Sequence, residues 1–441
     1  MTECNRELLT FSSLSSRKIL ADFDGGRLTS DAGGLLLREV DRRIGLTAAL
    51  AECIADPRDP EKIVHDVQTM LAQRIHGIAL GYEDLNDHDA LRSDPVMQTL
   101  AERVPDEDTP LASPATLCRF ENRVTRQCVA RMSGVLVDQF IASFKRPPKQ
   151  LILDFDATDD RVHGDQEGKF FHGYYDHYCF LPLYVFCGDR LLCAYLRRSN
   201  IDPALHTRAI LRLLVNRLRA RWPKVRIIFR GDGGFCRWKL LKYCDEHDVG
   251  YVVGLARNEV LKRMARPFTA LAHSQFVTTG KKQRLFYELR YAAKTWDRER
   301  RVIVKAEYLP KGANTRFVVT NLEDAPEQIY DGIYTQRGDM ENRIKEQQLG
   351  LFADRTSCHG FIANQLRLLL ASAAYVLIEH LRRVGLRGTE LARAQVSTIR
   401  LKLFKIAARV RVSCRRIMLH LSSSCPYQPL LQRLTARLVP T

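Results

Sequence analysis

Acidic residues follow two apolar segments of the chain, where they could hold divalent metal ions. Residues 151–153 are a short apolar strand that runs into Asp154 and Asp156, and the apolar segment 225–229 is soon followed by Asp232. An apolar strand rarely buries an unpaired acid, which favours a functional role. Two-metal phosphoryl transfer needs several converging carboxylates, and α/β folds place sites at the carboxyl ends of strands. Because side chains alternate along a strand, Asp154 and Asp156 share a face, and either could be the first ligand.

A third acid follows from a helical spacing later in the chain. Tyr334, Arg337, Glu341, Lys345 and Gln348 step by three or four residues and therefore share one helix face. Such a face could present a metal-binding glutamate between cations that bind phosphates. The alternative is an exposed helix supported by an ion pair between Glu341 and Lys345. The spacing alone does not decide between these two interpretations.

Three motifs in this order resemble those of the insertion-sequence DDE transposases. The first acid begins an Asp-x-Thr motif at Asp156, and the second, Asp232, lies in Arg-Gly-Asp-Gly-Gly-Phe. Glu341 ends a Tyr-x2-Arg-x3-Glu spacing, which matches the third-acid signature of that family. The likeness continues through residues 22–34 and 341–346. It therefore covers nearly the whole chain and points to the subgroup called transposase DDE domain group 1.

This resemblance implies a metal-dependent chemistry on DNA. Asp156, Asp232 and Glu341 would be the catalytic acids and would bind two Mg²⁺ ions, for which Mn²⁺ could substitute. An activated water would cut the element's ends, and the freed 3′-hydroxyl would then attack target DNA. The threonine spacing favours Asp156 as the first acid, with Asp154 as the alternative. No covalent intermediate between protein and DNA is expected.

Five residues outside the acid triad are expected to contact DNA. They are Tyr334, Arg337, Lys345, Trp296 and His172. The lysine of the family signature falls on Gln348 here, so Lys345, one turn earlier, is expected to take over its phosphate contact. Trp296 would stack on a flipped base, with packing in a small sheet as the alternative. His172 lies in an aromatic and basic run near the first acid, and hard oxygen ligands suit this chemistry better than its imidazole.

The distribution of charge predicts a polyanionic partner. The formal net charge is +17, and the segment from Leu381 to Thr441 contains thirteen Lys or Arg residues and one acid, Glu390. A basic segment of this kind suits DNA phosphates, and a solvated helix face is the alternative. We expect double-stranded DNA as the partner, both the terminal inverted repeats of the element and the target. Because two ends must be joined, we also expect a homodimer on DNA, and we expect no membrane partner.

The order of apolar segments predicts an α/β fold. Three strands in a row, followed by helix, strand, helix and strand, are typical of a ribonuclease-H-like catalytic core. We expect this core to be interrupted by a β-rich insertion and flanked by a mostly helical N-terminal domain and a basic C-terminal segment. In chain order, the predicted regions are a helical DNA-end-binding and dimerisation region (1–145), the first half of the core (146–258), the insertion (259–325), the second half of the core with the third-acid helix (326–380) and a basic DNA-binding region (381–441).

Cysteine usage and hydropathy favour a reducing cytoplasm, and the resemblance implies a bacterial protein close to the nucleoid. The twelve cysteines include no Cys-x-x-Cys pair, so neither a zinc site nor a disulfide framework is expected. Residues 1–20 lack the pattern of an export signal. The apolar segment 366–378 is short for a membrane span and is predicted to be a buried helix.

The sequence leaves two rival functions open. A haloacid-dehalogenase-type phosphatase opens with a strand followed by Asp-x-Asp-x-Thr, which residues 154–158 match, and Asp154 would then be the nucleophile. However, no further acid follows Asp232 within residues 233–238, and the basic C-terminal segment would have no role. A non-catalytic DNA-binding derivative of a transposase is the second rival, and the intact acids argue against it.

Overall fold

The computed structural model describes residues 8–439, which belong to two compact units. Unit 1 combines the chain up to Phe120 with the chain from His380 onward, and unit 2 runs from Glu121 to Glu379. The chain passes from one unit to the other within α6 (Pro114–Arg123) and at the end of α13 (Phe361–His380). The basic C-terminal segment therefore belongs to the same unit as the N-terminal helices.

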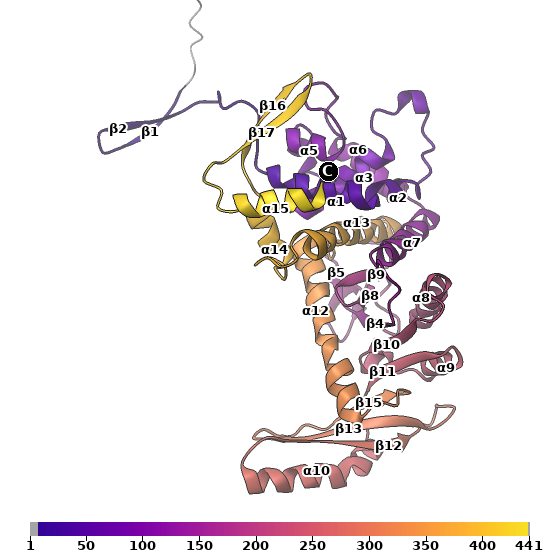
Figure 1. The fold of residues 1–441 in the computed structure, drawn as a ribbon. Coiled ribbons are helices and arrows are strands. Elements are labelled where there is room, and N and C mark those ends of the chain that lie inside the picture. Colours follow the sequence, from indigo (N-terminus) through magenta and orange to yellow (C-terminus); the bar gives the residue numbers. More distant parts are fainter. Residues whose placement is uncertain (1–7, 440–441) are drawn as a thin grey trace, which may run out of the picture. The chain divides into compact units, whose positions relative to one another are not determined.

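Unit 2 is built on a mixed nine-stranded sheet (Figure 1). Its strand order is β12-β13-β15-β11-β10-β4-β8-β9, and β14 pairs with β13. The strands are β4 (Gln150–Ala157), β8 (Leu183–Cys187), β9 (Arg190–Tyr195), β10 (Arg226–Gly231), β11 (Val249–Leu255), β12 (Gln283–Tyr291), β13 (Arg300–Leu309), β14 (Gly312–Ala313) and β15 (Arg316–Thr320). Strands β4, β10 and β11 run parallel to one another, and their neighbours are antiparallel. The α/β class predicted from the sequence is confirmed.

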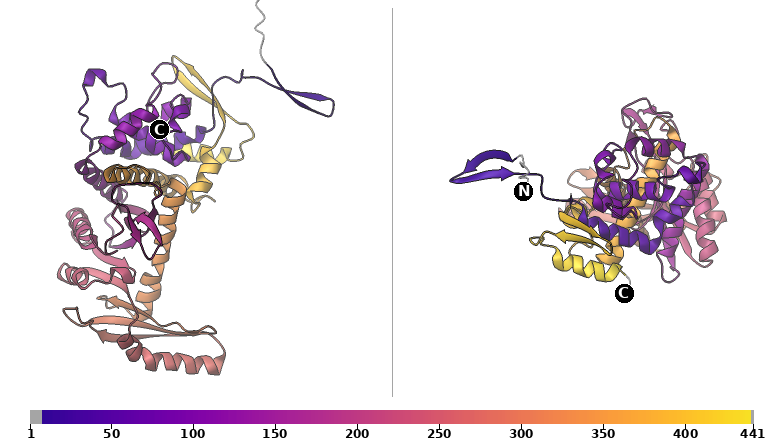
Figure 2. Two further views of the ribbon diagram at one scale, coloured as in Figure 1. Left: turned by 180° about the vertical axis from the view of Figure 1, so that it is seen from behind. Right: turned by 90° about the horizontal axis from the view of Figure 1, so that it is seen from above.

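The two faces of this sheet pack against different helices, as the alternation of side chains requires. Ile227 and Phe229 of β10 belong to a large core with α7 (Arg126–Ala142), α8 (Thr207–Arg221), α9 (Trp238–Glu246) and α10 (Glu259–Thr279). Ile228 belongs to a smaller core on the other face. The ribbon views show α8 and α9 on one side of the sheet and α12 on the other (Figure 2).

The helix that carries Glu341 is continuous but irregular. It consists of α11 (Pro326–Ile329), the π-helical η4 (Tyr330–Tyr334), the 3₁₀ turn η5 (Thr335–Arg337), α12 (Gly338–Lys345) and the π-helical η6 (Glu346–Gly350). Ile329 and Tyr330 pack on the smaller core of the sheet. π-Helical segments inside longer helices are frequent at functional sites.

A small sheet follows the first acid in the chain. It has the order β5-β7-β6, with β5 (Asp160–Arg161), β6 (Phe170–His172) and β7 (His177–Phe180). Asp160 of β5 pairs with Phe180 of β7. The aromatic run that contains His172 therefore forms a β-hairpin, and β5 extends it next to the end of β4.

The region predicted to be a β-rich insertion (259–325) also contains a long helix. It opens with α10, which contains Pro267, and its strands β12, β13 and β15 continue the main sheet. Further upstream, Thr125 caps the start of α7 by accepting a hydrogen bond from the Cys128 amide.

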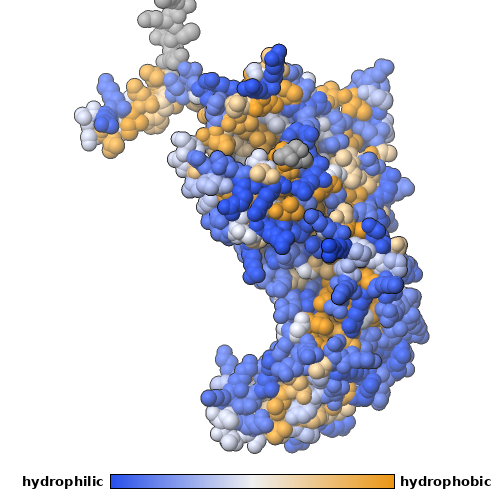
Figure 3. All heavy atoms as spheres, in the orientation of Figure 1, coloured by the Kyte–Doolittle hydropathy of each residue, from blue (hydrophilic) through white to orange (hydrophobic). Residues whose placement is uncertain are grey.

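Unit 1 combines short helices with two small sheets. Its helices are η1 (Ala32–Gly34), α1 (Leu35–Ile44), α2 (Leu46–Ala51), η2 (Pro60–Lys62), α3 (Val67–Leu80), α4 (His88–Leu91), α5 (Pro95–Leu100), η7 (Leu381–Gly385), α14 (Val396–Ile399), η8 (Arg400–Phe404) and α15 (Gln428–Leu438). One sheet pairs β1 (Leu9–Leu14) with β2 (Arg17–Ala21), and its large apolar side chains are exposed (Figure 3). The other has the order β17-β16-β3, with β3 (Leu28–Thr29), β16 (Ala408–Ser413) and β17 (Arg416–Leu421).

One helical stretch, Phe361–Gly385, is long and apolar enough to cross a membrane, but 83% of its most apolar window is buried inside the protein. Leu366, Leu369 and Leu370 of α13 are at most 1% exposed. The prediction of a buried helix over residues 366–378 is confirmed.

Candidate active site

Two of the predicted acids lie side by side at one edge of the nine-stranded sheet. Strands β4 and β10 are parallel neighbours, with Asp154 opposite Arg230 and Phe155 opposite Gly231. Asp232 follows directly after β10, so the register places it beside Asp156. Asp232 also caps the short turn η3 (Gly233–Phe235), because its Oδ1 atom accepts a hydrogen bond from the Gly234 amide at 2.9 Å.

Glu341 reaches the same region from the irregular helix, and Arg337 connects it to the sheet. The guanidinium of Arg337 donates a hydrogen bond to Asp156 Oδ2 at 3.2 Å and a second one to Glu341 Oε1 at 3.0 Å. The side chain of Asp156 is 14% exposed, whereas that of Glu341 is 49% exposed. The cluster is therefore buried on the side of the sheet and open on the side of the helix.

Asp156 is buried near two other carboxylates, and Arg337 is the nearby cation that offsets their negative charge. Burial raises the pKa of Asp156 to about 7, with further increases from the charges of Asp232 and Glu341, while Arg337 opposes the rise. Active sites often contain carboxylates perturbed in this way. A cation that approached Asp156 would relieve this repulsion.

The oxygen donors at this edge fit a hard divalent ion such as Mg²⁺. Within residues 8–439, no three His, Cys, Asp or Glu side chains are gathered closely enough to form a complete metal site. The guanidinium of Arg337 is the positive group that bridges Asp156 and Glu341. The carboxylate oxygens of these acids are nevertheless of the kind that Mg²⁺ prefers.

Asp154, the alternative first acid, has a different partner. Its carboxylate forms a buried ion pair with Arg230, and both side chains are less than 10% exposed, at 3% and 7%. Arg230 also donates to the carbonyl oxygens of Ile333 and, at 3.4 Å, Gln336, both on the irregular helix. Burial raises the pKa of Asp154, and Arg230 opposes that rise. The pair thus joins two strands to the helix that carries Glu341.

Tyr334 lies on the same helix face and packs against the sheet. A Cβ atom on Gly254 would be 2.6 Å from the hydroxyl oxygen of Tyr334 and 2.9 Å from the backbone nitrogen of Gly233. Position 254 must therefore be glycine for the helix to approach this closely. Lys345, by contrast, is exposed and makes no ion pair within the part of the chain that the structure describes.

Gln348, at the position of the signature lysine, is tied to the segment after the first acid. Its side-chain amide donates to the Asp159 carbonyl and to Asp160 Oδ1, both at 2.9 Å. Asp160 is fully buried, and burial raises its pKa well above the usual range. Gln348 therefore links the helix that carries Glu341 to the small sheet through these two hydrogen bonds, which we call the Gln348 clamp. It is not an exposed phosphate ligand.

His172 and Trp296 are further from the acids. His172 pairs with His177 across the β6–β7 hairpin, and the His177 ring is 2.7 Å from Asp159 Oδ2. Trp296 packs edge-on against Tyr291 and beneath the guanidinium of Arg300. The structure thus gives Trp296 core contacts, and it does not bring Trp296 or His172 into contact with the acid cluster.

Sequence reasoning missed Arg230 altogether, and it placed Gln348 on the helix face without finding its partner. Arg230 lies two residues before Asp232 on an apolar strand, where strand alternation puts it on the face of the acids. A buried arginine needs an anionic partner. This requirement could have predicted the ion pair between Arg230 and Asp154 from the sequence. No local signal identified Asp160 as the partner of Gln348, because 188 residues separate them.

Carboxylates from two neighbouring strands and a helix, with an arginine among them, are typical of enzymes that transfer phosphoryl groups with metal ions. The family model of the transposase DDE domain group 1 matches residues 11–441, and the chain belongs to this family. It is therefore a DNA transposase, which cleaves DNA and transfers strands.

One solved transposase structure resembles this chain weakly. A cryo-EM structure of the piggyBac transposase synaptic complex with hairpin DNA is similar with a TM-score of 0.43 and 11% sequence identity, over 94% of this chain and 86% of that chain. At this TM-score the likeness does not establish a shared fold. Comparison with curated protein sequences gave no match.

Proposed function

We propose that Asp156, Asp232 and Glu341 are the catalytic acids of this transposase and that they bind two Mg²⁺ ions, with Mn²⁺ as a substitute. The observation that carries this proposal is the charge imbalance at Asp156. Its carboxylate is buried beside Asp232 and Glu341, and Arg337 is the cation that bridges it to Glu341. When bound, the ions would activate the attacking oxygen and stabilise the leaving one.

The side chains around the acids position the DNA. Arg337 is a forked donor, so it can hold a phosphate oxygen beside Glu341 as well as a carboxylate. Tyr334 keeps the helix against Gly254, and Gln348 fixes its far end to Asp160. Exposed Lys345 adds a phosphate contact on the open side of the cluster. Because the strands and the clamped helix are rigid, the acids are held in place before the scissile phosphate arrives.

The reaction has two stages of phosphoryl transfer on double-stranded DNA. Water first attacks at the terminal inverted repeats of the element, and the resulting 3′-hydroxyl then attacks target DNA. The strands β9-β8-β4-β10-β11 form a ribonuclease-H-like core in which β4, β10 and β11 are parallel and β8 is antiparallel to β4. We assign the N-terminal helices to end binding and dimerisation, and the protein to the bacterial cytoplasm as the product of an insertion sequence.

The phosphatase alternative requires Asp154 as a free nucleophile. Asp154 is 2% exposed and is engaged by Arg230, so neither of its oxygens is open to a substrate. A carboxylate in a buried ion pair is also a weak nucleophile, because attack would leave Arg230 unpaired in the interior. The contacts of Asp154 therefore favour the transposase assignment of Asp156.

Replacement of Asp232 by Asn tests the proposal. We expect Mg²⁺-dependent cleavage of transposon-end DNA to fall by at least about a thousandfold, which corresponds to roughly 4 kcal/mol, while DNA binding is kept. The matched control is Asp248→Asn. The Asp248 side chain is fully exposed, and it precedes β11, so it lies at the opposite end of the parallel strands from Asp232. Unchanged cleavage by Asp232→Asn would refute the acid triad.

The substrate DNA for this test can be taken from the sequence that flanks the gene. Matching inverted repeats just outside the reading frame would define the ends of the element and supply the substrate.

A further inference from the structure

The thirteen Lys and Arg side chains of residues 381–441 include two groups, one that packs within unit 1 and one that is exposed. Lys405 forms an ion pair with Asp31 at 2.6 Å, and Arg400 donates to the carbonyl oxygens of Ala79 and Ile78. Arg437 donates to two carbonyl oxygens, and Arg382 is 8% exposed. These cations contribute to the packing of unit 1. They are not available to a polyanion.

A second group of cations is exposed on the β-ribbon formed by β16 and β17. Arg409, Arg411, Arg415 and Arg416 are all exposed. Within residues 8–439 none of the four makes an ion pair. Residues 408–421 contain no Asp or Glu. No acid within the ribbon itself therefore balances its positive charge.

The strand register places most of this charge on one face. Arg409 pairs with His420, Arg411 with Met418, and Ser413 with Arg416, so all six side chains lie on the same side of the ribbon. Arg415 lies in the turn. The opposite side is apolar, with Val410 5% exposed and Val412 half-buried. The ribbon is thus amphipathic, and its outward face is basic.

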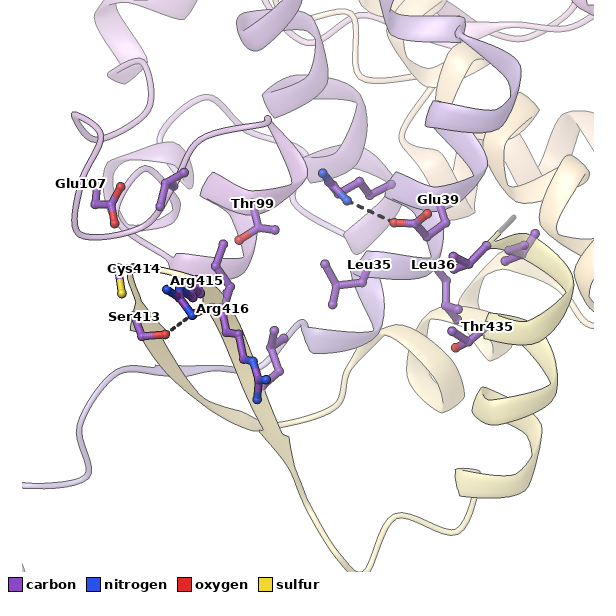
Figure 4. Close-up of a pocket in the computed structure, with 16 residues that line it drawn as sticks. Leu35, Leu36, Glu39, Thr99, Glu107, Ser413, Cys414, Arg415, Arg416 and Thr435 are labelled. Carbon is purple, nitrogen blue, oxygen red and sulfur yellow. Dashed lines mark hydrogen bonds and ion pairs between the residues drawn. The ribbon is translucent and has the colours of Figure 1, made fainter. Parts of the chain in front are cut away.

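One edge of the ribbon is held by the rest of unit 1. Strand β16 pairs with β3, and the Val410 amide donates to the Arg27 carbonyl at 2.8 Å. A cavity of about 620 Å³ separates the outer part of the ribbon from α1 and α15, and Leu35, Leu36 and Leu419 are among its lining residues (Figure 4). The turn at residues 413–416 borders the same cavity, together with Thr99, Val104 and Glu107.

From these contacts we infer that the β16–β17 ribbon binds duplex DNA through its arginine face, which deepens the proposed function by naming a DNA-binding surface. A two-stranded ribbon fits the major groove, which is about 12 Å wide, and arginine binds both phosphates and the guanine edge. Residues 408–421 contain no Phe, Tyr or Trp. Single-stranded DNA is usually bound on such aromatic rings, so the ribbon favours a duplex.

The test is DNA binding by the full-length protein without divalent metal, measured by fluorescence anisotropy across a range of salt concentrations. The probe is a duplex of about three helical turns taken from the DNA that flanks the reading frame. The variant carries Arg409→Gln, Arg411→Gln and Arg416→Gln. A control variant removes three exposed cations of unit 2, through Arg263→Gln, Arg266→Gln and Lys281→Gln.

For the ribbon variant we expect affinity to fall about ten- to a hundredfold at physiological salt, and the slope of log affinity against log salt to shrink by about 0.9 for each phosphate that is no longer bound. Single replacements should each shrink the slope by at most about 0.9, which keeps the inference testable if the triple variant does not fold. A slope and an affinity equal to those of the control variant would overturn it. The result does not depend on the acid triad, since Asp232→Asn should bind the probe normally.

Discussion

Asp154 and Asp156 lie two residues apart on the same face of β4, yet their surroundings differ in charge. Asp154 has a dedicated partner in Arg230, and this ion pair is buried and held further by carbonyl oxygens of the third-acid helix. Asp156 faces two other acids and shares a single arginine with one of them. The negative charge of Asp154 is balanced by Arg230. The negative charges of Asp156 and Glu341 share one arginine, Arg337. The difference is what our proposal rests on: Asp154 has a structural role, and Asp156 is the proposed metal ligand.

The largest effect on stability should come from breaking the balanced pair. Arg230→Ala leaves the Asp154 carboxylate buried without its partner, which should destabilise the protein by about 3–5 kcal/mol. A thermal or urea unfolding curve measures this loss. The double variant Asp154→Leu/Arg230→Met replaces the pair with apolar side chains and should recover most of the stability. If Arg230→Ala unfolds like the unmodified protein, the pair does not hold the strands and the helix together.

Removing the charge of Asp156, by contrast, should stabilise the protein. The pKa of Asp156 in the folded protein is raised to about 7. An acid with a raised folded-state pKa stabilises the fold below its unfolded pKa, and this stability is lost as the pH rises through about 7. Asp156→Asn should therefore stabilise the metal-free protein at pH 8 by up to roughly 4 kcal/mol, with little effect at low pH. Melting temperatures across this pH range test the expectation, and a destabilised variant at pH 8 would contradict it.

The Gln348 clamp should contribute less than either acid. Gln348→Ala removes two hydrogen bonds and leaves Asp160 Oδ1 buried without a partner, as Oδ2 already is, so we expect a loss of about 1–3 kcal/mol. Unfolding curves measure the loss of stability, and cleavage assays show whether the third-acid helix has become less well positioned. Gln348→Glu provides the comparison, because it keeps the shape of the side chain but removes the amide donor. Equal stability of Gln348→Ala and the unmodified protein would exclude the clamp.

The smallest effect is expected at Lys345, which is exposed. Lys345→Ala should leave the melting temperature unchanged, because no ion pair is broken. It should reduce the salt slope of DNA binding by about 0.9 if the side chain contacts one phosphate. Lys345→Arg, which keeps the charge, should bind as the unmodified protein does. An unchanged slope in Lys345→Ala would remove this residue from the DNA contacts.

The strands that carry the first two acids could be predicted because short-range patterns define them. Apolar runs mark β4 and β10, and alternation alone puts Asp154 and Asp156 on one face. The threonine spacing of the family motif favours Asp156, but the engagement of Asp154 in an ion pair could not be predicted in the same way. It depends on Arg230, which is 76 residues away and becomes a partner only when β10 pairs with β4.

The insertion shows a different limit of prediction from sequence. Helix α10 has an N-cap at Asn258 and buries Leu261, Ala265 and Ala272 at helical spacing. Pro267 lies inside it and weakens a helix prediction, because proline lacks a backbone donor. The strands of the insertion were recognisable, but their place in the main sheet was not. That place depends on the pairing of β15 with β11, which links segments about 65 residues apart in the chain.

The central claim is that Asp156, and not Asp154, is the first catalytic acid. Single-turnover nicking of transposon-end DNA in Mg²⁺ should be compared for Asp156→Asn and Asp154→Asn, at a temperature where both variants are folded. We predict that Asp156→Asn loses cleavage by at least about a thousandfold, whereas Asp154→Asn retains it within about tenfold. Normal cleavage by Asp156→Asn, together with loss of cleavage by folded Asp154→Asn, would contradict the account.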